Sequence, residues 1–468
     1  MQQWTGTWSA GAGGRALQSA SFLNDAFQQL DEVLKRKAEA QAQQPPPPPT
    51  QELKASQQMI QRWLVIFARD HPADICEKLM AAAMEHSATA VPARSLPKQQ
   101  LPTKSDEHDS RSELRGDGSI DYFLLDSLRR VLAAAAADES GAALRAVCEQ
   151  LRSAEKGGGD HSGRDPAQPG LLDFCYSRIS VVYSAPIRHV ASECVGLLSA
   201  ARLKPVVEMF LASLARVTSD RDEREFVPSM RATRLLQLST HSAEQAAASL
   251  AYLKALASSM ARVSRGVLRA EVCAALVEAL PRLMAPADDD RRGEWAEYCS
   301  GSAAREWWRA YAEVYSHMLR WARGKGAHAP FCYEAMVPML ALASRPDAGD
   351  GGDAFADKAR REQLLLLLAA ALKRDARPRC LPLAATFVAS LPVAFLRADL
   401  GSGARESPIR RLCQEVLPRR HLPDASEGEH VLRLLLALAA AQPDAAYALQ
   451  LVRDSLHPGS PATRPQRA

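Results

Sequence analysis

The sequence has few aromatic residues, little net charge and no long apolar run. Aromatic residues make up 6% of the 468-residue chain although 47% of it is hydrophobic. Much of the apolar content is alanine and leucine, which favour helices over strands because neither is β-branched. The formal net charge of +4 gives no reason to expect a nucleic-acid partner. The longest apolar stretches, such as 364–372, are far shorter than the roughly 20 residues of a membrane span.

The cysteines give no sign of a disulfide framework or a zinc site. There are nine, an odd number, and none forms a C-x-x-C pair. The first residues, 1–14, lack the basic-then-apolar order of a secretory signal. These features predict buried free thiols in a reducing compartment, and therefore a cytoplasmic protein without a membrane span.

No catalytic motif is present. The glycine-rich residues 11–14 do not follow a predicted strand, and the sequence contains no P-loop, H-E-x-x-H or G-x-S-x-G pattern. Asp347, Asp350 and Asp353 are spaced by three residues, whereas a calcium-binding EF-hand loop requires a spacing of two, so we interpret 347–353 as a solvent-exposed loop. We expect a non-enzymatic protein with no cofactor and no metal. A helical enzyme without a recognisable motif is the alternative.

Apolar residues recur at helical spacing through most of the chain. The stripe Val272, Leu276 and Leu280 is typical, and Thr50 stands where a helix N-cap is expected. From 171 to 457, proline and glycine separate the helices, and helix pairs recur at about 35–45 residues, the spacing of HEAT and armadillo repeats. The sequence therefore predicts an all-α fold, an α-solenoid of degenerate repeats.

The predicted organisation alternates helical blocks with linkers that are rich in proline and charge. The linkers cannot bury enough apolar surface to offset the entropy of ordering them. We predict a flexible arm at 1–15, N-terminal helices at 16–86, a disordered linker at 87–118, a helical hairpin at 119–154, a linker at 155–170, the repeat region at 171–457 and a tail at 458–468.

Two features could bind partners, and each has a structural alternative. Pro45 to Pro49 would form a polyproline II segment that SH3, WW or profilin-like domains can bind, or a stiff spacer after a helix. Trp307 and Trp308 are adjacent in a predicted helix, so their side chains point about 100° apart. They could form an exposed aromatic anchor for a protein, or pack in the core between two neighbouring helices.

The order of motifs from Phe22 onward is similar to that of a known protein family. The opening helix SFLNDAFQQLDEVLKRK is similar to the first helix of that family. Residues 193–217 and 230–284 resemble two further family passages, with Arg234, Leu235, Val277 and Glu278 among the matching positions. The final stretch is the most similar: LAAALKRDARPRCLPLAATFVASLPVAFLR, followed by LCQEVLPRRHLPDASEGEHVLRLLLALAAAQPDAAYALQLVRDSL. The order of these motifs resembles the N-terminal region of the cell morphogenesis proteins, the Furry family. The linkers 87–118 and 155–170 do not match.

The resemblance implies a non-enzymatic α-solenoid scaffold that supports polarised growth and cell shape. Members of the family work with NDR-class kinases and their Mob co-activators, and associate with the cell cortex and cytoskeleton. Family members are very large, so this sequence would be an N-terminal fragment, a truncated gene model or a short relative. The alternative is a generic HEAT-like adaptor in transport or complex assembly.

A basic cluster within the most similar stretch is the strongest candidate for partner binding. Arg410, Arg411, Arg419 and Arg420 lie in the stretch between Pro408 and Pro423. They could form an electrostatic patch that steers an acidic protein surface and raises its association rate. The alternative is a solvated basic loop, because exposed charges usually contribute little.

Overall fold

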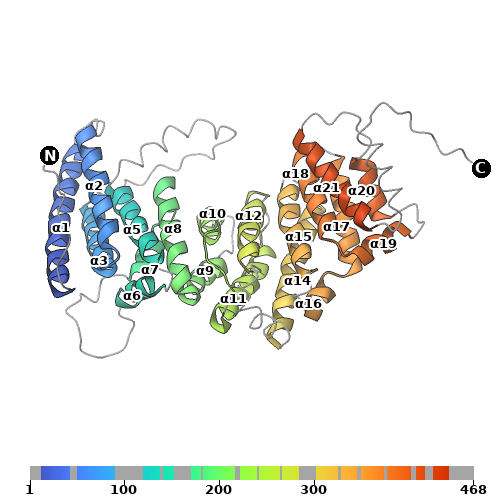
Figure 1. Ribbon diagram of the computed structural model, residues 1–468, viewed down its shortest axis with the longest axis horizontal. Coiled ribbons are helices and arrows are strands. Elements are labelled where there is room, and N and C mark those ends of the chain that lie inside the picture. Colours follow the sequence, from blue (N-terminus) through green and yellow to red (C-terminus); the bar gives the residue numbers. More distant parts are fainter. Residues whose placement is uncertain are drawn as a thin grey trace, which may run out of the picture. The chain divides into compact units, whose positions relative to one another are not determined.

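The structure is entirely helical in the part of the chain that it describes. The computed structural model describes residues 12–42, 50–89, 120–137, 141–151, 170–180, 183–216, 222–239, 242–263, 266–283, 302–324, 328–344, 349–373, 377–401, 407–416 and 425–441. These residues form nineteen helices and no strand (Figure 1). The prediction of an all-α fold is therefore confirmed for them. Residues 1–11, Pro45 to Pro49, most of both predicted linkers and the tail lie outside the described residues.

The chain divides into two compact units. Unit 1 consists of Met1–Phe210 and Arg224–Gln237, and unit 2 of Leu211–Glu223 and Leu238–Ala468. The sequence analysis places one repeat region over 171–457, and the division between the units falls inside that region.

Unit 1 is a succession of packed helices, of which α5 is the centre. Helix α1 packs on α2, both α2 and α3 pack on α5, and α5 packs on α8. One side of α5 is buried, and its residues Leu124, Leu125, Leu128, Val131 and Leu132 are all at most 1% exposed. Thr50 caps α2 as predicted, since its Oγ1 accepts a hydrogen bond from Leu53 N at 3.3 Å. The helices are α1 (Ala12–Ala42), α2 (Gln51–Phe67), α3 (Pro72–Thr89), α5 (Ile120–Ala136), α6 (Ala142–Gln150), α7 (Leu171–Ser177), α8 (Ala185–Ala201), the start of α9 (Leu203–Arg216) and most of α10 (Asp222–Thr233).

A close backbone approach joins α8 to the segment after α10. A Cβ atom on Gly196 would lie 2.7 Å from the carbonyl oxygen of Leu235, so only glycine fits there without movement. Next to this contact, Ser199 Oγ accepts a hydrogen bond from Gln237 N at 2.8 Å. The small residues of α8 thus fix the path of the chain where unit 1 ends.

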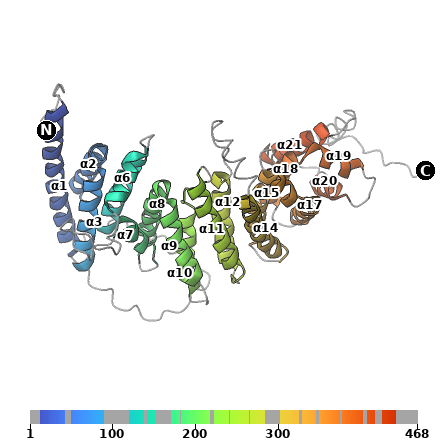
Figure 2. The ribbon, with the colours of Figure 1, turned by 90° about the horizontal axis from the view of Figure 1, so that it is seen from below.

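Unit 2 contains a row of four helices, each of which packs on the next. Helix α12 contacts α15, α15 contacts α18, and α18 contacts α21; beside this row, α11 packs on α14 and α17 on α20 (Figures 1 and 2). The stripe predicted for α12 is buried, and Val272, Leu276 and Leu280 are all 0% exposed. The helices are α11 (Ala243–Met260), α12 (Gly266–Leu283), α14 (Ser302–Ala322), α15 (Ala329–Ala343), α16 (Gly349–Phe355), α17 (Lys358–Leu372), α18 (Arg377–Ser390), α19 (Val393–Gly401), α20 (Pro408–Val416) and α21 (Ala425–Ala441).

Two segments differ from the local sequence signals. Pro228 was expected to separate helices but lies inside α10. Residues 349–353 of the predicted solvent-exposed loop 347–353 belong instead to the short helix α16. Phe355 at the end of α16 is 3% exposed and packs against Trp308 of α14, with ring centroids 5.9 Å apart. Burial of this one aromatic ring therefore stabilises a helix that glycine alone disfavours.

Candidate partner-binding surface on α20

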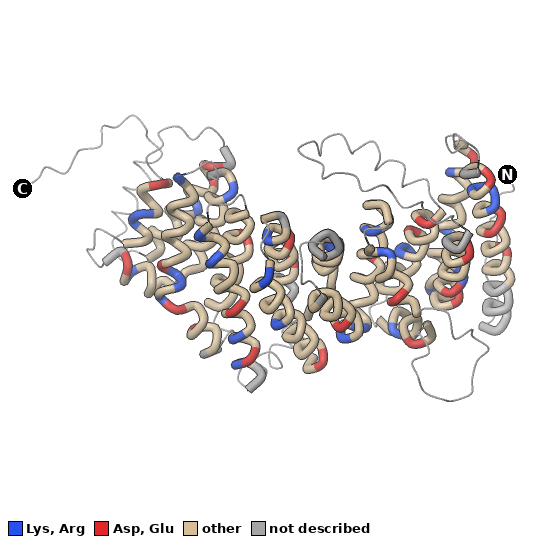
Figure 3. Tube along the Cα trace, turned by 180° about the vertical axis from the view of Figure 1, so that it is seen from behind, with Lys and Arg blue, Asp and Glu red and all other residues tan. Residues whose placement is uncertain are grey.

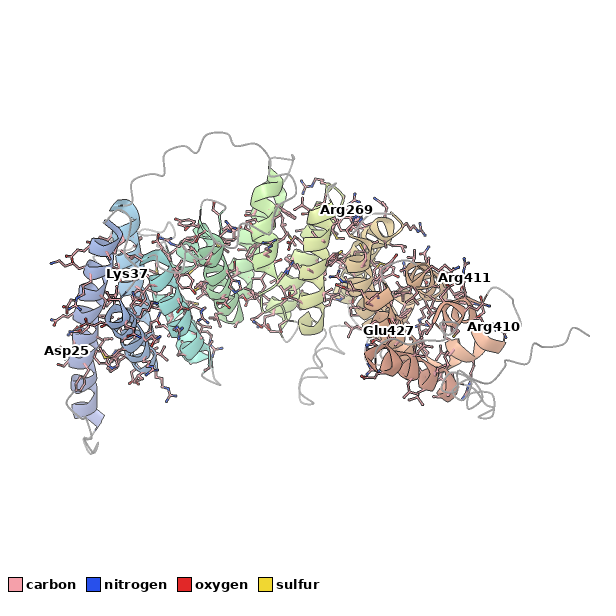
Figure 4. All side chains as sticks on the ribbon, turned by 90° about the horizontal axis from the view of Figure 1, so that it is seen from above. Asp25, Lys37, Arg269, Arg410, Arg411 and Glu427 are labelled. Atoms are coloured by element: carbon pink, nitrogen blue, oxygen red, sulfur yellow. The ribbon has the colours of Figure 1, made fainter. Side chains whose placement is uncertain are left out.

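Helix α20 is short and has one strongly apolar side. Ile409, Leu412 and Val416 are spaced by three and four residues and are at most 1% exposed, because α20 packs on α17. Arg410 and Arg411 occupy the opposite side and are exposed (Figure 4). The sequence pattern I-R-R-L-x-x-x-V thus places both guanidinium groups in solvent by burying the residues around them.

The start of α20 is fixed by a serine cap and by a carboxylate from the preceding helix. Ser407 Oγ accepts a hydrogen bond from Arg410 N at 3.2 Å, as expected of an N-cap serine followed by proline. Asp399 of α19 accepts hydrogen bonds from Ser407 Oγ and, at 3.2 Å, from Ile409 N. A carboxylate beside a helix N-terminus also interacts favourably with the helix dipole. The two arginines are therefore held on a backbone that is anchored to α19.

The acidic groups near this helix already have partners. Glu415 of α20 forms an ion pair with Lys373, with Oε1 2.8 Å from Nζ, and this pair joins the end of α17 to α20. Asp399 is engaged by the cap. Among the described residues no carboxylate forms an ion pair with Arg411. Cys413, which is half-buried on the same helix, has its pKa raised to about 12 by burial and by Asp399, so it is a protonated thiol at neutral pH.

The structure brings together half of the predicted basic cluster. We name Arg410 and Arg411 the α20 basic face. Arg419 and Arg420 lie outside the described residues. Elsewhere, basic and acidic residues are interspersed along the helices of each unit (Figure 3). The sequence analysis missed Asp399 and Ser407, although Ser407 followed by Pro408 is a recognisable helix-start signal. No local signal identifies Asp399, because its partners come from the next helix.

The predicted tryptophan pair lies in the interior of unit 2. Trp307 is 1% exposed and Trp308 is 6% exposed. Trp308 packs edge-on against Tyr311, with ring centroids 5.4 Å apart, and stacks on Phe355. Their burial corresponds to the core-packing alternative and not to the exposed anchor, because α14 packs on α11, α15 and α16. We therefore leave both tryptophans out of the candidate surface.

The described residues include few side chains that could bind a metal ion or take part in catalysis. They contain no group of three or more His, Cys, Asp or Glu side chains that could hold a metal ion. Eight of the nine cysteines are described; all eight are free thiols and seven of them are buried. His189 is exposed beside Glu193, with Nε2 and Oε1 3.6 Å apart, and His317 is buried, which lowers its pKa. Among the described helices, none is by itself long and apolar enough to cross a membrane, and α18 with α19 reaches that composition only as a pair bent by 106°.

Comparison with known proteins adds no relative. No family model matches the chain, and no curated protein matches it. The resemblance to the Furry family therefore remains a prediction from the order of motifs in the sequence.

Proposed function

We propose that the chain is a non-enzymatic scaffold of stacked helical repeats of the Furry type, which binds other proteins on its surface. The observation that supports this most is the packing order in unit 2, where α12, α15, α18 and α21 contact one another in succession. In HEAT and armadillo solenoids each helix pair likewise contacts its neighbours, and the stack offers an extended surface to partners. Such a protein works by holding its partners together.

The α20 basic face is the part of this surface that we propose contacts an acidic partner. Two arginines on a helix that is capped by Ser407 and Asp399 present their charges with little backbone freedom. Exposed charges of this kind mainly raise the rate of association, and salt screens their effect over a Debye length of about 10 Å at 0.1 M.

The resemblance provides the identity of the proposed partners. An NDR-class kinase with its Mob co-activator is the first candidate, and components of the cell cortex and cytoskeleton are the second. The role would be support of polarised growth and cell shape. A generic HEAT-like adaptor in transport or complex assembly shares the same helix stacking and differs in its partners.

Affinity purification of the full chain from cells, followed by mass spectrometry, separates these two functions. Recovery of kinase and Mob subunits is expected for a Furry-type scaffold. Recovery of transport factors or coat subunits in their place would contradict the Furry assignment and favour the adaptor. Recovery of no stable partner at low salt would contradict both.

A second experiment tests the α20 basic face with the purified kinase–Mob complex. The variant Arg410→Ala/Arg411→Ala should associate more slowly than the wild type at low salt, by about threefold to tenfold, and the difference should shrink as salt is added. The matched control is Arg305→Ala/Arg309→Ala, which removes two exposed arginines from α14 of the same unit. Equal rates for the α20 variant and the control would remove this face from the proposal while leaving the scaffold function in place.

A further inference from the structure

Arginines recur where the helix pairs of unit 2 turn from one helix to the next. Arg262 lies in the turn between α11 and α12, and Arg323 directly follows α14; both side chains are exposed. Arg269 is half-buried in the first turn of α12 (Figure 4), and Arg379 is exposed in the first turn of α18. We name Arg262, Arg269, Arg323 and Arg379 the turn-edge arginines.

Contacts between helices place these residues along one edge of unit 2. Arg269 Nη1 lies 3.4 Å from Nε2 of His328, the residue that precedes α15. Arg379 Cζ lies 4.8 Å from the ring centroid of Phe331, in the first turn of α15. The starts of α12, α15 and α18 are therefore side by side. Packed neighbouring helices are about 8–10 Å apart, so arginines of successive helix pairs follow one another at intervals of roughly that length.

Neutral groups of the protein hold these guanidinium groups in place. Arg269 Cζ lies 5.3 Å from the ring centroid of Trp321, and Arg379 contacts an aromatic ring in the same way. Arg262 Nη2 donates a hydrogen bond to the carbonyl oxygen of Leu214 at 3.4 Å. Rings and carbonyl groups restrict an arginine side chain without cancelling its charge, and they leave its other N–H groups available to a ligand.

The turn-edge arginines have no acidic partner in the described part of the chain. None of the four forms an ion pair with a described carboxylate. Glu415, which lies on the neighbouring helix α20, is instead paired with Lys373 at the end of α17. The positive charge at this edge is therefore available to an acidic group from outside the chain.

An extended acidic peptide matches the spacing of these arginines. An extended chain advances about 3.3–3.6 Å per residue, so acidic side chains about three positions apart lie roughly 10 Å apart along it. Successive carboxylates could then accept hydrogen bonds from successive guanidinium groups. A nucleic acid or an anionic membrane is attracted by a broad basic field. Here basic and acidic residues are interspersed along the helices (Figure 3), and the formal net charge of the chain is only +4.

We propose that the turn-edge arginines bind an extended acidic segment of a partner protein, with acidic residues about three positions apart. This surface is separate from the α20 basic face. The inference goes beyond the proposed function because it names a class of ligand for a second surface, and it does not depend on the Furry assignment.

Fluorescence anisotropy with the full chain and labelled peptides tests the proposal. The probe is a neutral peptide of about twelve residues into which glutamate is placed at every third position, which gives it the predicted spacing. A comparison peptide of the same composition has its glutamates next to one another. At low salt the variant Arg262→Gln/Arg323→Gln/Arg379→Gln should bind the spaced peptide about tenfold more weakly than the wild type does. Arg269 is kept, because it is half-buried against Trp321 and contributes to packing.

The matched control removes three exposed positive charges from the other end of two of the same helices. It is Arg305→Gln/Arg309→Gln/Lys358→Gln, with substitutions near the starts of α14 and α17. Its affinity for the spaced peptide should stay within about twofold of the wild type. Because Arg410 and Arg411 are intact in both variants, kinase–Mob binding at the α20 basic face is tested separately.

Equal affinities of the variant and the control for the spaced peptide would overturn the proposal. Equal binding of the spaced and the comparison peptide by the wild type would also overturn it. Tighter binding of an oligonucleotide of the same net charge, or of phosphatidylserine vesicles, would assign the edge to another class of partner. If the triple variant fails to fold by circular dichroism, Arg262→Gln/Arg323→Gln replaces it, with an expected loss of about threefold.

Discussion

The substitution Gly351→Ala tests the packing of the aromatic cluster in unit 2. Gly351 lies in α16, directly on the indole of Trp308. A Cβ at this position would overlap Cδ1 of Trp308 and would lie 2.6 Å from its Nε1, which is far closer than real Cβ contacts. The indole has little room to move, because it is 6% exposed and packs against Tyr311 and Phe355. The added methyl group must therefore displace either α16 or the ring.

A second helical glycine supplies the reference for the magnitude. Gly428 lies in α21, and a Cβ there would meet no atom within 4 Å. Replacing glycine by alanine inside a helix stabilises a protein by about 0.5–1 kcal/mol, and both substitutions share this gain. Overpacking a well-packed core costs about 1–3 kcal/mol, and only Gly351→Ala incurs it. We expect Gly428→Ala to raise the free energy of unfolding. The free energy of unfolding of the Gly351→Ala protein should be about 1–3 kcal/mol lower than that of the Gly428→Ala protein.

Urea unfolding followed by tryptophan fluorescence and circular dichroism measures the difference. The double variant Gly351→Ala/Trp308→Leu adds a direct test. The smaller, flexible leucine removes the clash, so in the Trp308→Leu background Gly351→Ala should stabilise the protein about as much as Gly428→Ala does. Similar stabilisation by both glycine substitutions in the wild-type background would refute the reasoning, since it would show that α16 is not pressed against Trp308.

Two further predictions concern one residue in each unit. Leu276→Asp should destabilise unit 2 by roughly several kcal/mol, because Leu276 is 0% exposed and an unpaired carboxylate would be buried. The control Leu366→Asp, at a position that is 37% exposed, should destabilise the protein much less. Equal melting temperatures of the two variants would contradict the burial of Leu276. Lys37 is 5% exposed with its Nζ 5.7 Å from the ring centroid of Phe123 (Figure 4), and burial lowers its pKa to about 8. The unfolded chain therefore binds the proton of the Lys37 ammonium group more tightly than the folded protein does. Burial of the charged ammonium group lowers stability below pH 8. This cost disappears as the pH rises from about 8 towards the ordinary pKa of 10.5. Lys37→Met should stabilise the protein at pH 7 by roughly 1–3 kcal/mol and by less at pH 10, and a gain independent of pH would contradict the assignment.

The sequence by itself determined the helices and the sides that they bury. Helical spacing of apolar residues identified the core stripe of α12, including Leu276, because a helix that is apolar on one side must cover that side. It also identified the Thr50 cap and the basic pair on α20, since both depend on residues within four positions of each other. These are local properties, and local chemistry is sufficient to predict them.

The tertiary structure alone decided which helices touch and how these contacts determine the conformation and burial of particular residues. The glycine-rich residues 349–355 carry every local signal of a loop, yet they form a helix because Phe355 is buried against Trp308 of another helix. The adjacent tryptophans could have been exposed or buried, and the helices around α14 determine that they are buried. Asp399 could not be assigned a role until α19 and α20 were placed side by side. Each of these outcomes depends on contacts between different helices, which outweigh the weak preferences of the local sequence.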